Sequence, residues 1–182
     1  MEKYIEKSKE LKIYGSFDVI VVGGGTAGAV AAIASAREGM NTLVIEQFGA
    51  LGGLSTLGVV TPVMHSGIKG NPMCSGISDE INQYCLDNGY SFRDWNNNAG
   101  HNDPLFLRFA FESLAVKAGV KILYHTYFSD VIKEGNELKG IIVENKAGRQ
   151  AIYGKRIIDA TGDADVSVIA GVGYEKGNPK TG

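Results

Sequence analysis

One glycine-rich stretch limits how this chain can fold more than any other part of it. Residues 19–22 form an apolar run that is typical of a buried parallel strand. They lead directly into Gly23-Gly24-Gly25-Thr26-Ala27-Gly28, a complete G-x-G-x-x-G pattern. An Ala-rich helix is predicted from about residue 25 to residue 38, ending at Gly39, and a second apolar run at residues 42–45 ends on Glu46. This order predicts a β–α–β unit of the dinucleotide-binding type.

Each glycine of the pattern has a predicted mechanical role. Gly23 allows a tight turn, Gly25 lets the backbone approach a pyrophosphate, and Gly28 lets the helix pack closely on the strand. The free amides at the start of the helix, together with its dipole, favour phosphate. Glu46 follows Gly28 by 18 residues, where an acid can accept hydrogen bonds from a ribose. The complete order of elements disfavours the alternative, in which the glycines serve only a β–α turn.

Composition excludes several classes of function. A chain of 182 residues with 44% hydrophobic content suits one globular domain, and a net charge of −2 gives no electrostatic reason to expect nucleic acid or a membrane as a partner. Residues 1–15 are polar and are expected to form a surface leader, without the apolar core of a signal peptide. Cys74 and Cys85 lack the spacing of a zinc knuckle or a redox C-x-x-C motif. We therefore expect a cytoplasmic protein with reduced thiols and no metal site.

The middle of the chain predicts a glycine-rich loop and two helices. Residues 48–72 are expected to form an extended loop or a short helical turn. Residues 75–86 have helical spacing, which makes Cys85 a core residue rather than a reactive thiol. Residues 87–103 are polar and turn-rich, either a lid or a long connection. Asn102-Asp103-Pro104 then predicts the start of a helix that ends at Gly119.

The last third of the chain changes from helical to strand patterns. Residues 120–124 are expected to form a third parallel strand, and residues 127–133, 138–144 and 150–153 are typical of an antiparallel β-meander. A separate last strand at 156–159 leads into Ala160-Thr161-Gly162-Asp163 and a short helix at 166–170. The predicted fold class is α/β, a Rossmann-like parallel sheet with a three-stranded antiparallel β-meander.

Together these motifs resemble the broad family of FAD-dependent oxidoreductases with two dinucleotide folds. The family pattern stands here as Gly23 to Gly28, Ile45-Glu46, Leu51-Gly52-Gly53 and Ala160-Thr161-Gly162-Asp163. The resemblance extends from Asp18 onward and implies an FAD-binding domain in residues 16–182. Members of the family usually continue into a substrate domain. The resemblance therefore also implies a further C-terminal part, in a longer protein or as a separate subunit.

The resemblance implies a set of residues that hold FAD. Those expected at the pyrophosphate are Gly23, Gly24, Gly25, Thr26, Ala27 and Gly28, with Gly52, Gly53, Leu54 and Ser55 approaching from the other side. Glu46 would bind the adenosine ribose, the main chain near Phe128 would meet the adenine edge, and Ala160, Thr161 and Gly162 would close over the cofactor. Gln47 departs from the basic residue that often follows this Glu. Asp163 either reaches a hydroxyl or a backbone donor, or caps the helix at 166–170.

The residues that act beside the flavin ring are much less evident, because the flavin itself carries the redox chemistry. His65, in the loop after Gly53, is a weak candidate for substrate contact or proton transfer, and a histidine without a role is the favoured alternative. His101 and His125 are expected to be structural. The expected function is flavin-mediated hydride or electron transfer on an unknown small-molecule substrate. An NAD(P)-dependent dehydrogenase and a truncated flavin-binding module without turnover stay open as alternatives.

Overall fold

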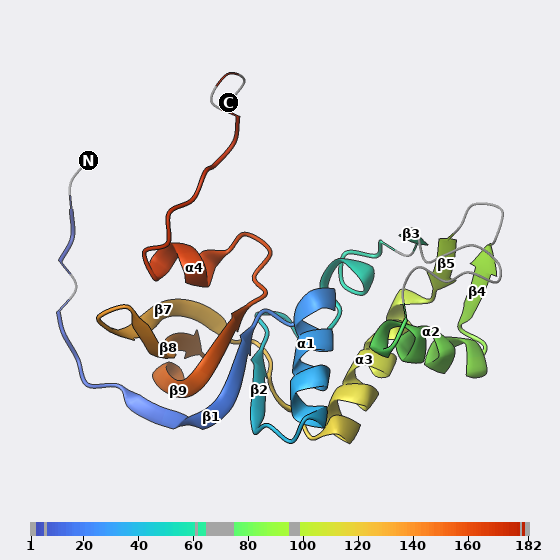
Figure 1. The fold of residues 1–182 in the computed structure, drawn as a ribbon, viewed down its shortest axis with the longest axis horizontal. Coiled ribbons are helices and arrows are strands. Elements are labelled where there is room, and N and C mark those ends of the chain that lie inside the picture. Colours follow the sequence, from blue (N-terminus) through green and yellow to red (C-terminus); the bar gives the residue numbers. More distant parts are fainter. Residues whose placement is uncertain are drawn as a thin grey trace.

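The computed structural model describes residues 3–5, 7–60, 62–64, 75–94, 99–178 and 180, with the backbone alone at 62–64, 93–94 and 99–100. The main six-stranded sheet contains, in spatial order, β6 (Lys121–Leu123), β2 (Thr42–Ile45), β1 (Lys12–Val22), β9 (Gly148–Asp159), β8 (Glu137–Asn145) and β7 (Tyr127–Glu134). A smaller sheet contains β3 (Pro62–Met64), β5 (Ala99–Asn102) and β4 (Ser91–Asp94). The helices are α1 (Thr26–Arg37), α2 (Ile77–Asp87), α3 (Pro104–Ala118) and α4 (Asp165–Ile169), with a 3₁₀ turn η1 at Gly53–Ser55 (Figure 1).

The main sheet combines two kinds of strand pairing. Strands β6, β2, β1 and β9 are parallel neighbours, whereas β9, β8 and β7 pair antiparallel as a meander. The order β6-β2-β1 is the 3-2-1 order of a Rossmann half. The structure therefore confirms the predicted fold class, a Rossmann-like parallel sheet with an antiparallel meander.

The second half of strand β1 lies at the centre of the domain and is buried on both faces. Val19 and Val21 belong to the core beneath α1, α2 and α3, and Ile20 and Val22 belong to the core beneath the meander. Side chains alternate between the two faces of a strand, so a strand covered on both faces needs a continuous apolar run. Residues 19–22 provide that run. The layers are thus helices, parallel sheet and meander (Figure 1).

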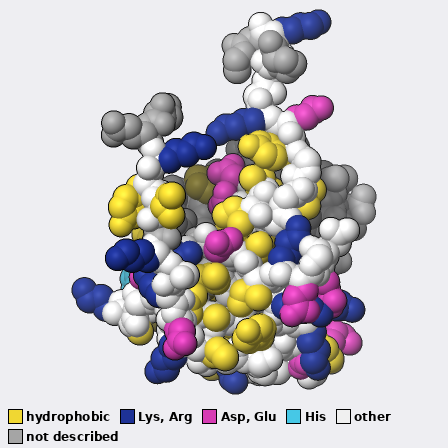
Figure 2. Space-filling view, turned by 90° about the vertical axis from the view of Figure 1, so that its left-hand side faces the viewer, with side chains coloured by type: hydrophobic (Ala, Val, Ile, Leu, Met, Phe, Trp, Pro, Cys, Tyr) yellow, Lys and Arg dark blue, Asp and Glu magenta, His cyan; other side chains and the backbone are white. Residues whose placement is uncertain are grey.

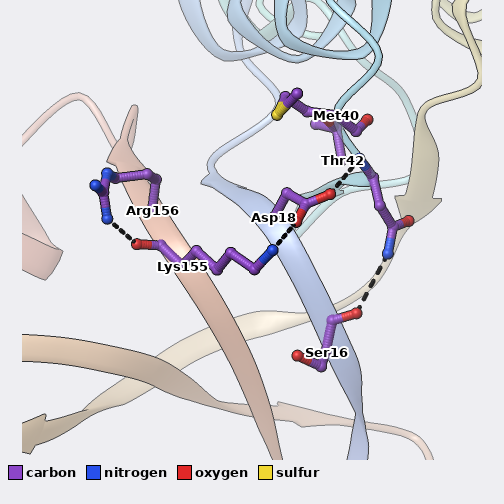
Figure 3. A network of polar contacts seen from close by, with 7 residues as sticks. Ser16, Asp18, Met40, Thr42, Lys155 and Arg156 are labelled. Carbon is purple, nitrogen blue, oxygen red and sulfur yellow. Dashed lines mark hydrogen bonds and ion pairs between the residues drawn. The ribbon is translucent and has the colours of Figure 1, made fainter.

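A polar network holds the start of this parallel region together (Figure 3). The Asp18 carboxylate accepts a hydrogen bond from the Asn41 amide at 3.0 Å and pairs with Lys155 Nζ at 2.7 Å. Asn41 Nδ2 donates to the Ser16 carbonyl oxygen at 3.3 Å. The hydrogen bond from Lys155 lowers the pKa of Asp18 below its ordinary value. The network joins β1 to β9 and to the α1–β2 turn, where the β1–β2 pairing begins and away from the glycine loop.

One prediction about the meander is wrong. Residues 150–153 and 156–159 belong to a single strand, β9, which pairs with β8 through its first half and with β1 along its length. The intervening Gly154 resembles a turn in the sequence, but a Cβ on it would come within 2.6 Å of Ile20 Cδ1. Gly154 therefore lets β9 continue as one strand beside β1, because a side chain at this position would collide with Ile20.

The N-terminal boundary also differs from the prediction. Residues 12–15, expected in the leader, begin β1, where Lys12 pairs with Gln150 and Ile13 with Ala151. Residues 3–5 and 7–11 have no regular secondary structure. The side of the molecule that carries the meander exposes apolar side chains among charged ones (Figure 2). Ile13 and Tyr14 on β1 and Tyr153 on β9 are among the exposed large apolar residues.

The helices of the middle region agree with the sequence predictions. Asp103 caps α3, because its carboxylate accepts from the amides of Leu105 and Phe106 at 2.8 and 2.9 Å. Gly119 ends α3 with a φ of 87°. Residues 87–103, expected as a lid or a connection, instead contain β4 and β5, with Phe92 stacked on His101. Within the described ranges, no helix is long and apolar enough to cross a membrane.

Replacing Gly28 by Ala tests how tightly α1 packs on β1. An added Cβ would lie 1.9 Å from the Gly23 carbonyl oxygen, so one of the two segments must move. We expect Gly28→Ala to lower the free energy of unfolding by about 1–3 kcal/mol in urea titrations, although Gly→Ala usually stabilises a helix by about 1 kcal/mol. Gly25→Ala is the control, because its Cβ meets nothing within 4 Å. A Gly28→Ala protein as stable as wild type would contradict the packing.

Alkylation at Cys85 tests its assignment to the core. The side chain is 0% exposed, and burial together with nearby Asp103 raises the pKa of the thiol to about 11. A shift of this size lowers the thiolate fraction about 100-fold, so iodoacetamide should leave Cys85 unmodified in the native protein near pH 8. Peptide mass spectrometry reports the labelling, with urea-unfolded protein as the positive control. Equal labelling of both samples would refute the assignment.

Candidate dinucleotide site

The glycine loop lies at the carboxyl end of β1, between β1 and α1. Gly23 has a φ of 98° and donates its amide to the Ile45 carbonyl oxygen at 3.0 Å. A Cβ on Gly23 would come within 2.4 Å of the Ala160 carbonyl oxygen, and a Cβ on Gly25 would meet nothing within 4 Å. Packing therefore requires glycine at positions 23 and 28, whereas position 25 borders open space. Gly23 and Gly28 thus have the predicted roles in a turn and in a close helix contact, and the approach of a phosphate to Gly25 stays a prediction.

The start of α1 presents amides to this open space. Gly25 is the N-cap residue and has an extended backbone, no side chain caps the helix, and its first turn contains no acidic residue. The first amides of a helix have no acceptor within the helix, and its dipole places partial positive charge there. An anion beside Gly25 would therefore meet hydrogen-bond donors without a competing carboxylate from the helix itself.

Glu46 connects the end of β2 to the glycine loop. It is 6% exposed, and its Oε2 accepts from the Gly24 amide at 2.7 Å while Oε1 accepts from the Phe48 amide at 2.8 Å. The carboxylate thus fixes the loop as well as lying near it. Each carboxylate oxygen can accept a second hydrogen bond, so a ribose contact remains compatible with both amides.

A second turn, at residues 51–55, lies against the glycine loop. Gly52 has a φ of 100° and donates its amide to the Gly24 carbonyl oxygen at 2.8 Å. A Cβ on Gly53 would come within 3.0 Å of Gly25 Cα. Thr26 Oγ1 donates to the Gly52 carbonyl oxygen at 3.0 Å and lies 3.2 Å from Ser55 Oγ. The predicted Leu-Gly-Gly motif and the glycine loop therefore form one surface, beside which Leu54 is 74% exposed.

A third turn, at residues 160–163, approaches from β9. The Ala160 amide donates to the Val22 carbonyl oxygen at 2.9 Å, and Gly162 has a φ of 93°. The N-cap residue of α4 is Ala164, so the alternative in which Asp163 caps this helix is wrong. Asp163 is exposed. The sequence pattern gave no indication of Asp159, whose carboxylate accepts from both Thr161 and Ser167.

The segment after β6 lies beside the end of β2. The Thr126 amide donates to the Glu46 carbonyl oxygen at 3.0 Å, and the His125 amide donates to the Phe48 carbonyl oxygen at 3.2 Å. These bonds place residues 125 and 126 beside the segment that contains the exposed Gln47, and the adenine contact near Phe128 stays a prediction. The Phe128 side chain packs against the core beneath the meander, which leaves its backbone as the predicted contact.

The candidate histidine and one of the two cysteines are not located by this structure. His65 and Cys74 lie outside the described residues. Among the residues that are described, no group of three or more His, Cys, Asp or Glu side chains is placed to hold a metal ion. The structure thus brings together the nucleotide-binding motifs, and the contact of each residue with a cofactor stays a prediction.

Comparison with known proteins agrees with this geometry. Residues 18–182 match the FAD dependent oxidoreductase family. Thiamine thiazole synthase from Sulfolobus acidocaldarius is 30% identical over 84% of this chain and 58% of its own length, and NADH dehydrogenase from Bacillus subtilis is 38% identical over 39% of this chain and 14% of its own. The crystal structure of Thermovibrio ammonificans THI4 has a TM-score of 0.62 at 23% identity and covers 85% of this chain.

The chain spans less than two thirds of each of these proteins, with 61% of the THI4 chain as the largest share. The family match nevertheless covers all the motifs described above, from the start of the buried part of β1 to the end of the chain. FAD is the cofactor that this family's description names. The chain belongs to the FAD-dependent oxidoreductase family.

Proposed function

We propose that this chain binds FAD non-covalently along the carboxyl ends of β1, β2 and β9, as the nucleotide-binding part of an oxidoreductase. The observation that carries the proposal is the meeting of three separate turns around the open space at Gly25. The Gly52 amide bonds to Gly24, and Ala160 packs directly on Gly23. The free first amides of α1 lie where these turns meet, and such donors suit a pyrophosphate.

The site offers complementary groups to each part of FAD. The amides at the start of α1 would hold the pyrophosphate from one side, and residues 52–55 would approach from the other. Glu46 would accept from the adenosine ribose with its remaining lone pairs, and the backbone near Phe128 would meet the adenine. Thr161, Gly162 and Asp163 would border the ribityl chain. The groups expected to contact FAD are Gly23, Gly24, Gly25, Thr26, Ala27, Gly28, Glu46, Gln47, Gly52, Gly53, Leu54, Ser55, Phe128, Ala160, Thr161, Gly162 and Asp163.

FAD, when bound, supplies hydride or electron transfer with a small-molecule substrate, and the chain's own residues bind and orient it. The family match over residues 18–182 favours this function over an NAD(P)-dependent dehydrogenase. We include in the proposal that further polypeptide, in the same protein or in a partner subunit, completes the substrate side. The greater length of the relatives supports this, as do the exposed apolar Leu105, Phe109 and Val116 on α3.

A cytoplasmic location is also part of the proposal. Its support is the free thiol of Cys85, because reducing compartments keep thiols unpaired.

The direct test is to purify the chain and record its visible absorption, then identify any compound released on denaturation. Flavin bands with FAD released are the expected result. Colourless protein is titrated with FAD and, separately, with NAD. Uptake of NAD but not of FAD would overturn the proposal in favour of the dehydrogenase alternative. Bound FAD that is reduced by dithionite but by no physiological donor would favour the module without turnover.

Replacing Gly25 by Ala tests the position of the pyrophosphate. The new methyl group would enter space that is open in this structure, and the φ of −60° at Gly25 suits an L residue. We therefore expect a folded protein that binds FAD about tenfold or more weakly, measured by flavin fluorescence, because a Cβ would hold the pyrophosphate away from the backbone.

Gly173→Ala is the matched control for this variant. Gly173 also has open space around its Cβ position but lies in the tail after α4. Its replacement should leave FAD affinity within a factor of about two. Equal affinities of the two variants would place the pyrophosphate elsewhere.

A further inference from the structure

Asp159 is the last residue of β9, and it pairs with Val22 immediately before the glycine loop. Its carboxylate is saturated by nearby donors. Oδ1 accepts from the Thr161 amide at 3.3 Å and from Thr161 Oγ1 at 2.8 Å. Oδ2 accepts from the Ser167 amide and from Ser167 Oγ, both at 2.8 Å. One side chain therefore holds the turn at residues 160–163 and the middle of α4.

Thr161 extends this network across the turn. While its hydroxyl donates to Asp159, its oxygen accepts from the Asp165 amide at 2.9 Å. That bond serves the first turn of α4, whose N-cap residue, Ala164, has a left-handed backbone and no side-chain cap. Gly162 also has a positive φ, of 93°. This segment thus contains two residues with a positive φ, Gly162 and Ala164. The hydrogen bonds of Asp159 and Thr161 fix the chain on either side of them.

This turn forms one wall of the candidate site. A Cβ on Gly23 would come within 2.4 Å of the Ala160 carbonyl oxygen, and a Cβ on Gly28 would lie 3.0 Å from Ala160 Cβ. A shift of Ala160 would therefore change its contact with the glycine loop directly. Asp159 itself has no need to touch a ligand, because it acts through the backbone of residues 160–162.

The charge of Asp159 strengthens these bonds. Partial burial acts to raise the pKa of the carboxyl, but the hydrogen bonds from Ser167 and Thr161 outweigh it and hold the pKa below its ordinary value of 3.8. The group is therefore ionised at neutral pH, and hydrogen bonds to an ionised acceptor are stronger than neutral ones.

We propose that Asp159 is a positioning residue for FAD: it fixes the Ala160–Thr161–Gly162 turn in its binding shape before the cofactor arrives. A site that is ordered in advance loses less conformational freedom on binding and so binds more tightly. This proposal rests on the proposed function, since it assumes that FAD lies between this turn and the glycine loop.

The test compares FAD affinity in two matched variants, Asp159→Asn and Asp18→Asn. Both remove one carboxylate that accepts from backbone amides on the β1–β9 pair, but Asp18 lies in the middle of β1, away from the glycine loop. We expect Asp159→Asn to bind FAD about tenfold or more weakly and Asp18→Asn to stay within about threefold of wild type. Circular dichroism and the melting temperature establish that each variant is folded, and the visible circular dichroism of bound flavin should change only for Asp159→Asn.

Two further variants cover the case in which Asp159→Asn does not fold. Thr161→Val removes the hydroxyl that bridges Asp159 and Asp165 and should weaken FAD binding. Ser167→Ala removes one donor to Asp159 on α4, at a residue outside the predicted FAD contacts, and should weaken FAD binding a few-fold, about three to ten times. Wild-type affinity in both Thr161→Val and Ser167→Ala would overturn the assignment of Asp159.

The outcome for wild-type protein separates the two proposals. Wild type that takes up no FAD would contradict the proposed function, and this positioning role with it. Wild type that binds FAD, together with equal affinities in Asp159→Asn and Asp18→Asn, would contradict only the role of Asp159.

Discussion

The contact between Gly28 and the carbonyl oxygen of Gly23 sets the geometry on which the rest of the site depends. No Cβ fits at Gly28, because it would lie 1.9 Å from that oxygen. The absence of a side chain lets α1 begin directly on the end of β1. Gly23 in turn packs on Ala160, so the same contact determines how closely β9 ends beside β1. Three chain segments that are distant in sequence meet there because Gly23 and Gly28 have no Cβ atom that would keep them apart.

Carboxylates on both neighbours of β1 then fix the loops that glycine makes possible. Glu46 ends β2 and accepts from the amides of Gly24 and Phe48, and Asp159 ends β9 and accepts from Thr161 and Ser167. The three turns, at residues 22–28, 51–56 and 159–163, contain no Lys or Arg. Phosphate in this site would therefore be held by backbone N–H groups and the α1 dipole instead of by cationic side chains. The acids contribute by fixing the conformation of the turns, because their oxygens accept from other amides, those of Gly24, Phe48, Thr161 and Ser167.

The sequence predicted the features that depend on local chemistry. The glycine loop, the Asp103 cap and the apolar face that buries Cys85 each follow from neighbouring residues, and the structure contains all three. The features that it missed depend on partners far along the chain. In the sequence Gly154 resembles a turn residue, but in the structure it lies against Ile20. Residues 12–15 resemble a leader in the sequence, but in the structure they begin the strand that pairs with β9. Asp159 was overlooked for the same reason, since Ser167 lies on the next helix and gives no signal in a strand pattern.

The contacts between distant segments also explain how the domain can retain its fold when most side chains change. The contacts that bring the turns together are backbone bonds, such as Gly52 amide to Gly24 carbonyl and Ala160 amide to Val22 carbonyl, and they require only small residues at a few positions. Core positions on β1 and β2 accept any apolar residues of suitable volume. A structure that is 23% identical can therefore share the fold with a TM-score of 0.62. The glycines and acids that shape the predicted cofactor site are few, and one fold can serve different substrates through residues elsewhere.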